Sequence, residues 1–182
     1  MNILLSLVEI YLPASLKMKS LKELFSLTAN AFHSQCPSLQ GYSYPELLDK
    51  YAAFTEIEAK YRLKSGDQLQ GIQESLYQQA ERMGKNLQIT FRTSNFHDTL
   101  RLCRVVYRGI GIDFQGNDRG EIRILRCFFG KYYSKEVCEV MSSLDRGLVA
   151  GISGGGQLNF EYRITEGRDC CLAHLSPQEK NS

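Results

Sequence analysis

The spacing of apolar residues changes once along this chain, and this change constrains the fold more than any other feature. Residues 19–35 and the segments that follow, as far as Gly84, carry apolar side chains at the helical spacing. From Leu87 onward, several segments alternate between apolar and polar residues at period two, which is typical of half-buried strands. The sequence therefore predicts an α+β fold, in which a helical N-terminal half packs on a four- to five-stranded antiparallel sheet.

Local signals place the helices of the first half. Ser43 and Glu46 form a capping-box pattern, which predicts a helix from there to about Leu63, and Gly84 is expected to end the next helix. The apolar segment from Ile3 to Leu12 predicts a short helix that packs on the body or serves as a homodimer contact.

The second half is expected to mix strands and helices. Asn95 is the predicted cap of a helix over 96–108. The other predicted elements are a strand over 87–91, a hairpin over 110–128, a helix over 134–153 and a hairpin over 157–175. Hairpin connections imply antiparallel pairing. With no internal repeat or linker, residues 1–182 are expected to form a single domain, with a helical half (1–84), a sheet-forming half (85–175) and a tail (176–182).

Charge and length narrow the classes of partner. The chain has 22 Lys and Arg against 20 Asp and Glu, a net charge of +2, which gives no footprint for nucleic acid or an anionic membrane. The apolar start is far shorter than the ~20 residues that span a bilayer, and it lacks the basic region of a signal peptide. We therefore expect a cytoplasmic protein with six reduced cysteines, no nucleic-acid partner and no membrane insertion.

Adjacent cysteines near the end, Cys170 and Cys171, are the most unusual candidates for chemistry. Neighbouring strand residues point to opposite faces, so only one of these thiols can face the core or a pocket. That thiol is either a small core residue or a thiolate whose pKa is lowered by a nearby cation. Zinc is a further alternative, held by Cys138, Glu161 and Cys171, although no Cys-x-x-Cys pair supports it.

The closing segment carries a family resemblance. Its string Glu-Gly-Arg-Asp-Cys-Cys, at 166–171, resembles the C-terminal signature of the L-2-amino-thiazoline-4-carboxylic acid hydrolase family. Upstream, Arg126-Cys127-Phe128 is similar to the family's strand that ends in Arg-Cys. Asp145 matches the acidic residue of the family's Cys-x-x-Asp helix, whereas Ser142 stands where the family has Cys. The resemblance covers residues from about 85 to 175.

This resemblance implies an enzyme without a cofactor that opens a thiazoline carboxylate ring by hydrolysis. Such chemistry needs an activated water or thiolate, a general acid or base, and a donor for the substrate carboxylate. Cys127, Asp145 and Cys171 are the expected catalytic groups. Arg104, Arg126 and Ser142 are the expected substrate-binding residues.

A second resemblance leads to another class of protein. The run Gly147–Gly151, followed by a strand and a Gly-x-x-Cys, is similar to 4-vinyl-reductase-type domains, which bind small molecules in sensors. Some of these domains hold zinc through Cys and Glu, to which Cys138 and Glu161 would correspond. Ile164 stands where a further Cys is usual. The alternatives at this point are a hydrolase, a non-catalytic binding domain and an interaction protein with no ligand.

Topology predicts where either site would lie. The helix over 134–153 joins the two hairpins and should cross the sheet, so that its inward face meets inward-facing strand residues. We expect a pocket between Cys127, the helix face with Cys138, Ser142 and Asp145, and the strand with Cys171, holding a small carboxylate.

Overall fold

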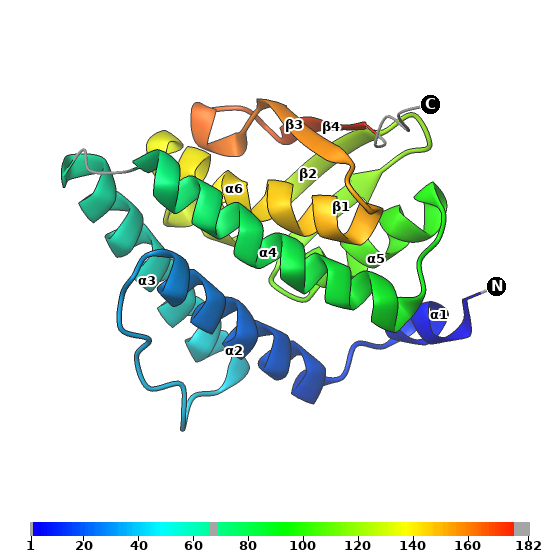
Figure 1. Ribbon diagram of the computed structural model, residues 1–182, viewed down its shortest axis with the longest axis horizontal. Coiled ribbons are helices and arrows are strands. Elements are labelled where there is room, and N and C mark those ends of the chain that lie inside the picture. Colours follow the sequence, from blue (N-terminus) through cyan, green and yellow to red (C-terminus); the bar gives the residue numbers. More distant parts are fainter. Residues whose placement is uncertain (1, 66–68, 177–182) are drawn as a thin grey trace.

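A computed structural model describes residues 2–65 and 69–176, and it has the predicted α+β architecture (Figure 1). Over these residues the helical half comes first and a four-stranded antiparallel sheet follows. The helices are α1 (Ile3–Ile10), α2 (Ala14–Ala31), α3 (Tyr44–Ser65), α4 (Leu69–Phe91), α5 (Phe96–Arg108) and α6 (Lys135–Ser153). The strands are β1 (Ile112–Gly116), β2 (Glu121–Cys127), β3 (Gln157–Tyr162) and β4 (Cys171–Ser176), with 3₁₀ turns η1 (Phe128–Lys131) and η2 (Ile164–Glu166).

Capping residues begin the helices where the sequence predicts. The Glu46 carboxylate accepts a hydrogen bond from the Ser43 backbone N–H at 2.8 Å, which is the return contact of the capping box. The Asn95 side chain accepts from the Asp98 N–H at 2.9 Å, and α5 has the bounds predicted for it. The short N-terminal helix also forms as α1, and Asn2 caps it.

The predicted strand over 87–91 is wrong, because α4 continues through Gly84 to Phe91. Gly84 is a packing residue rather than a helix stop: a methyl group there would lie 2.4 Å from the Leu148 carbonyl oxygen on α6. The helix ends instead beside Arg92, which has a positive φ of 49°. The sheet consequently begins at Ile112, well after the predicted residue 85.

The sheet has the order β1-β2-β4-β3, so each predicted hairpin is one half of it. The halves join along β2 and β4, where Ile124 lies opposite Cys171. Helix α6 connects β2 to β3 and packs against the sheet, as the topology predicts (Figure 1). The predicted tail lies outside the described residues except for Ser176, which ends β4.

The backbones of α4 and α6 lie so close together that there is no room for a side chain at the glycines between them. A methyl group on Gly147 would lie 2.1 Å from the Tyr77 carbonyl oxygen, and one on Gly151 would lie 2.2 Å from that of Glu81. Buried apolar side chains from the helices and the sheet form one continuous core. Among the described residues, the helices are too short or too polar to cross a bilayer.

Candidate functional site

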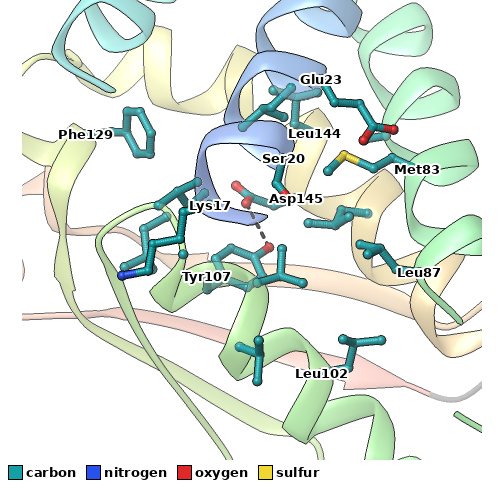
Figure 2. A pocket seen from close by; sticks show the side chains of 18 of the residues that line it. Lys17, Ser20, Glu23, Met83, Leu87, Leu102, Tyr107, Phe129, Leu144 and Asp145 are labelled. Carbon is teal, nitrogen blue, oxygen red and sulfur yellow. Dashed lines mark hydrogen bonds between the residues drawn. The ribbon is translucent and has the colours of Figure 1, made fainter. Parts of the chain in front are cut away.

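A largely apolar cavity of about 540 Å³ is lined by residues of helices α1, α2, α4, α5 and α6 and of the sheet (Figure 2). Its volume falls within the ~300–1,000 Å³ that is usual for small-molecule sites. Among its lining residues, Met83, Leu87, Leu102, Phe129 and Leu144 are apolar. The cavity can therefore hold a small molecule with a mainly apolar body.

Asp145 of α6 places a carboxylate in this apolar space. The Tyr107 hydroxyl, from α5, donates to its Oδ1 at 2.8 Å (Figure 2). Burial raises the pKa of Asp145 to about 6, while the Tyr107 hydrogen bond and the charges of Arg163 and Arg146 act in the opposite direction. The site thus contains an acid that changes its charge close to neutral pH.

Arg163 adds a cation to the cavity wall, but protein groups already bind it. Its Nε donates to Ser142 Oγ at 3.1 Å, and its guanidinium pairs with Glu139 at 2.7 Å. The same guanidinium lies 4.7 Å from the centre of the Phe160 ring. We infer that Arg163 is chiefly a fixed part of the wall that orders Ser142.

Three thiols, Cys127, Cys138 and Cys171, line the same cavity. Burial raises the pKa of Cys127 to about 12 and that of Cys171 to about 11, and it also raises the pKa of Cys138. These shifts are opposite to the lowered pKa expected of a nucleophilic thiol, so the thiols stay protonated at neutral pH. Of the adjacent pair, only Cys171 lines the cavity. All six cysteines lie in the described ranges and are unpaired there.

The structure brings together four of the six predicted catalytic and binding residues. Cys127, Ser142, Asp145 and Cys171 line the cavity, and the helix that joins the hairpins carries two of them, as the topology predicts.

Arg104 and Arg126 lie elsewhere, in a shallow depression beside β1. The Arg126 side chain is 86% exposed and pairs with Asp113 at 3.5 Å. Because Cys127 faces the cavity, its neighbour on the strand faces the opposite way. These arginines are therefore not placed to hold a substrate carboxylate in the cavity.

The alternative zinc set is not assembled either. Glu161 is exposed and lies 3.4 Å from His174, whereas Cys138 and Cys171 line the cavity. Within residues 2–65 and 69–176, no group of three or more His, Cys, Asp and Glu side chains is arranged to hold a metal ion.

Sequence reasoning missed Tyr107 and the helices that form the far wall. Tyr107 is 1% exposed and stacks on Phe114 with ring centres 4.9 Å apart, so from the sequence it is indistinguishable from a core aromatic residue. The available signal was chemical: a buried Tyr hydroxyl needs a polar partner, and Asp145, already predicted as a catalytic group, is an acid on a largely buried helix.

Comparison with known proteins adds no relative. A scan against profiles of known protein families finds no matching family, and a search of curated proteins finds no match. Both resemblances described from the sequence therefore stay predictions.

Proposed function

We propose that this protein binds a small, largely apolar molecule in the cavity and that the molecule presents one hydrogen-bond donor to Asp145. The observation that carries the proposal is the cavity itself, about 540 Å³ with mainly apolar walls and a carboxylate inside. Among the described residues, Tyr107 is the one hydrogen-bond partner of that carboxylate. A ligand hydroxyl or amine would supply a second bond in this largely apolar space.

The polar groups around Asp145 favour a donor over the small carboxylate expected from sequence, whereas Lys17, Lys19 and Glu23 line the cavity on α2. With a pKa of about 6, Asp145 is mostly ionised at pH 7, so a ligand carboxylate would add a like charge in an apolar space. Arg163 already pairs with Glu139, which weakens its attraction for an anion. A neutral or cationic amphiphile fits these charges better.

A displacement assay tests the proposal. N-Phenyl-1-naphthylamine, an apolar fluorophore with one N–H, should bind with saturable fluorescence enhancement at one molecule per chain. Decan-1-ol should displace it at about tenfold lower concentration than decanoate at pH 7.5, and Asp145→Asn should reduce this preference. Absence of saturable binding, or equal displacement by alcohol and carboxylate, would overturn the proposal.

A cavity-filling variant provides the control for location. Val106 lines the cavity and is only partly buried, so Val106→Trp should block the probe while the protein stays folded. Tight probe binding to a folded Val106→Trp variant would mean that the probe sits elsewhere.

Hydrolysis is the second candidate, because Cys127, Asp145 and Cys171 meet in one cavity and Asp145 has a pKa suited to acid–base work near neutral pH. In this reaction Asp145 would accept a proton from water as it attacks C2 of 2-amino-thiazoline-4-carboxylate. Cleavage of the C2–S bond, with Asp145 returning the proton to the departing sulfur, would open the ring and give N-carbamoyl-cysteine. Production of that compound by wild type, and its loss in Asp145→Asn, would support this candidate; the raised thiol pKa values rank it second.

A further inference from the structure

We propose that the exposed apolar face of α1 is the docking surface for a second copy of this chain. The residues of this α1 face are each between 46% and 84% exposed: Ile3, Leu4, Leu7, Ile10 and Tyr11. At 3.6 residues per turn, Ile3, Leu4, Leu7 and Ile10 lie on one side of the helix, and Tyr11 follows as its C-cap residue. Leu5 and Val8 point into the core. Isolated exposed apolar residues are ordinary, but four on one short helix with a fifth at its C-cap form a patch.

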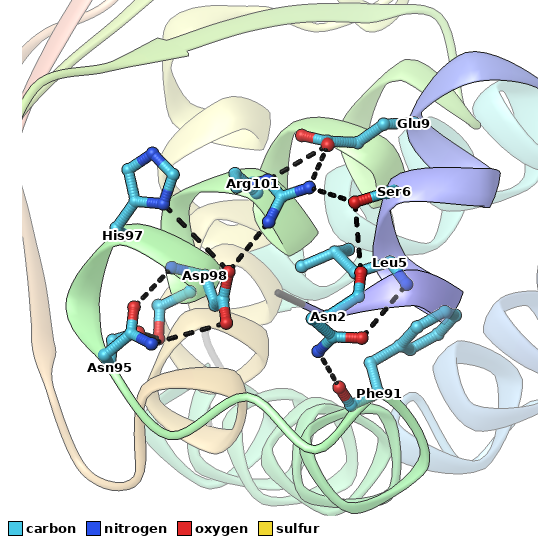
Figure 3. A network of polar contacts seen from close by, with 10 residues as sticks. Asn2, Leu5, Ser6, Glu9, Phe91, Asn95, His97, Asp98 and Arg101 are labelled. Atoms are coloured by element: carbon cyan, nitrogen blue, oxygen red, sulfur yellow. Dashed lines mark hydrogen bonds and ion pairs between the residues drawn. The ribbon is translucent and has the colours of Figure 1, made fainter.

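Polar contacts hold α1 in one orientation, so the apolar face is presented by a fixed element (Figure 3). Arg101 of α5 binds Glu9 at 2.6 Å and Ser6 at 2.9 Å, and it also pairs with Asp98 at 2.9 Å. The Asn2 side chain caps α1 and donates to the Phe91 carbonyl oxygen at the end of α4. With its polar side tied to the body, α1 cannot turn its apolar side inward without breaking these contacts.

The size of the α1 face fits an interface between proteins. Its five side chains expose on the order of 600 Å², against about 800 Å² buried by each partner in a stable complex of standard size. Neighbouring residues at the rim would supply the remainder.

Charge favours a second copy over a bilayer as the occupant. Helices that lie on membranes carry Lys and Arg beside the apolar face, whereas α1 has neither. Its one charged residue is acidic, Glu9, which lies off the apolar face and pairs with Arg101. An apolar face without net charge is complementary to itself, as an isologous two-fold contact requires.

The site proposed above gives this contact a consequence. Leu4 belongs to the α1 face and also lines the cavity, so a second copy would pack against part of the cavity wall. The docking proposal itself does not depend on that function, because it rests on the exposed face and the contacts that hold it.

Sedimentation velocity of the full chain up to about 100 μM tests the proposal. Wild type should sediment with twice the monomer mass of 20.7 kDa. The double variant Leu7→Glu/Ile10→Glu should be monomeric, with dimer affinity lowered at least about a hundredfold, because it places charges at the centre of the interface. Ile57→Glu is the matched control: Ile57 is 65% exposed, but it lies on α3 outside the α1 face, so this variant should stay dimeric.

Fold loss is separated from dissociation by circular dichroism. If the double variant unfolds, Ile10→Ser replaces it, because Ile10 is 84% exposed and contributes little to the core. A monomeric wild type, a variant that stays dimeric, or equal dissociation of the Ile57→Glu control would overturn the proposal. Co-sedimentation of a monomeric wild type with phosphatidylcholine–phosphatidylglycerol vesicles, lost in the α1 variant, would assign the face to a bilayer instead.

Discussion

Replacing Asp145 with Asn should stabilise the protein at neutral pH and should do so increasingly as the pH rises from 4 to 7.5. Burial raises the pKa of Asp145 from 3.8 to about 6, so between these values the native state binds more protons than the unfolded state. Stability conferred by the protonated acid is therefore lost as pH rises through this window. A shift of about two units corresponds to about 3 kcal/mol at 1.36 kcal/mol per unit.

Urea unfolding followed by circular dichroism measures this effect at intervals from pH 4 to pH 7.5. Asn has nearly the shape of Asp and can still accept from the Tyr107 hydroxyl, but it does not ionise. The difference in unfolding free energy between variant and wild type should grow by about 3 kcal/mol across the range. Curves that stay parallel from pH 4 to 7.5 would refute the reasoning, because Asp145 would then not titrate between its unfolded value and 6.

Tyr107→Phe provides the matched second variant. The Tyr107 hydrogen bond lowers the pKa of Asp145, so its removal should raise that pKa further. The loss of stability with rising pH should then continue above pH 6. If Tyr107→Phe shifted the transition to lower pH, the hydrogen bond would not be acting on the carboxylate as described.

Three further predictions concern packing, thiol chemistry and the anchoring of α1. Gly147→Ala should cost about 3 kcal/mol of unfolding free energy because its methyl group has no room against α4. Gly130→Ala is the control and should change stability little, because its methyl group would be 3.6 Å from its nearest neighbour. Equal costs for the two variants would contradict the close contact between α4 and α6. Cys127 and Cys171 should be alkylated in native protein at pH 7.5 at least about tenfold more slowly than after unfolding, measured by mass spectrometry, because burial raises the pKa of both thiols. Arg101→Met should cost about 2 kcal/mol and speed hydrogen exchange within α1, and unchanged exchange there would show that α1 is held by its apolar contacts alone.

Elements set by local signals could be predicted from the sequence. Asn95 and the apolar face after it determine both ends of α5, and Ser43 with Glu46 starts α3. The two hairpins and the helix between them follow from period, turns and connection length. That topology was also enough to place Cys127, Asp145 and Cys171 around one space.

Elements set by contacts between distant parts of the chain could not be predicted from the sequence. Gly84 predicts a helix end because glycine is common just after helices, yet here it is one of the glycines that let α6 approach α4. The alternation of Leu87 and Phe91 covers five residues only, too few to distinguish a strand from the end of a long helix whose apolar side lines a cavity. The outward direction of Arg126 was deducible, since it precedes the inward Cys127 on a strand.

Packing, electrostatics and the proposed ligand are linked through α6. Gly147 and Gly151 bring the backbone of α6 against α4, which leaves the helix that carries Asp145 little freedom to move. The backbone that carries the carboxylate is therefore held beside the apolar cavity, and burial of the carboxylate raises its pKa. A ligand that donates a hydrogen bond to Asp145 would offset part of the free-energy cost of burying this charge, and only while it is bound. The buried carboxylate that destabilises the empty protein at neutral pH would therefore contribute to ligand affinity. Asp145→Asn should therefore both gain stability and lose the preference for a donor ligand. A variant that gained stability but kept its preference between decan-1-ol and decanoate would show that Asp145 does not select the ligand.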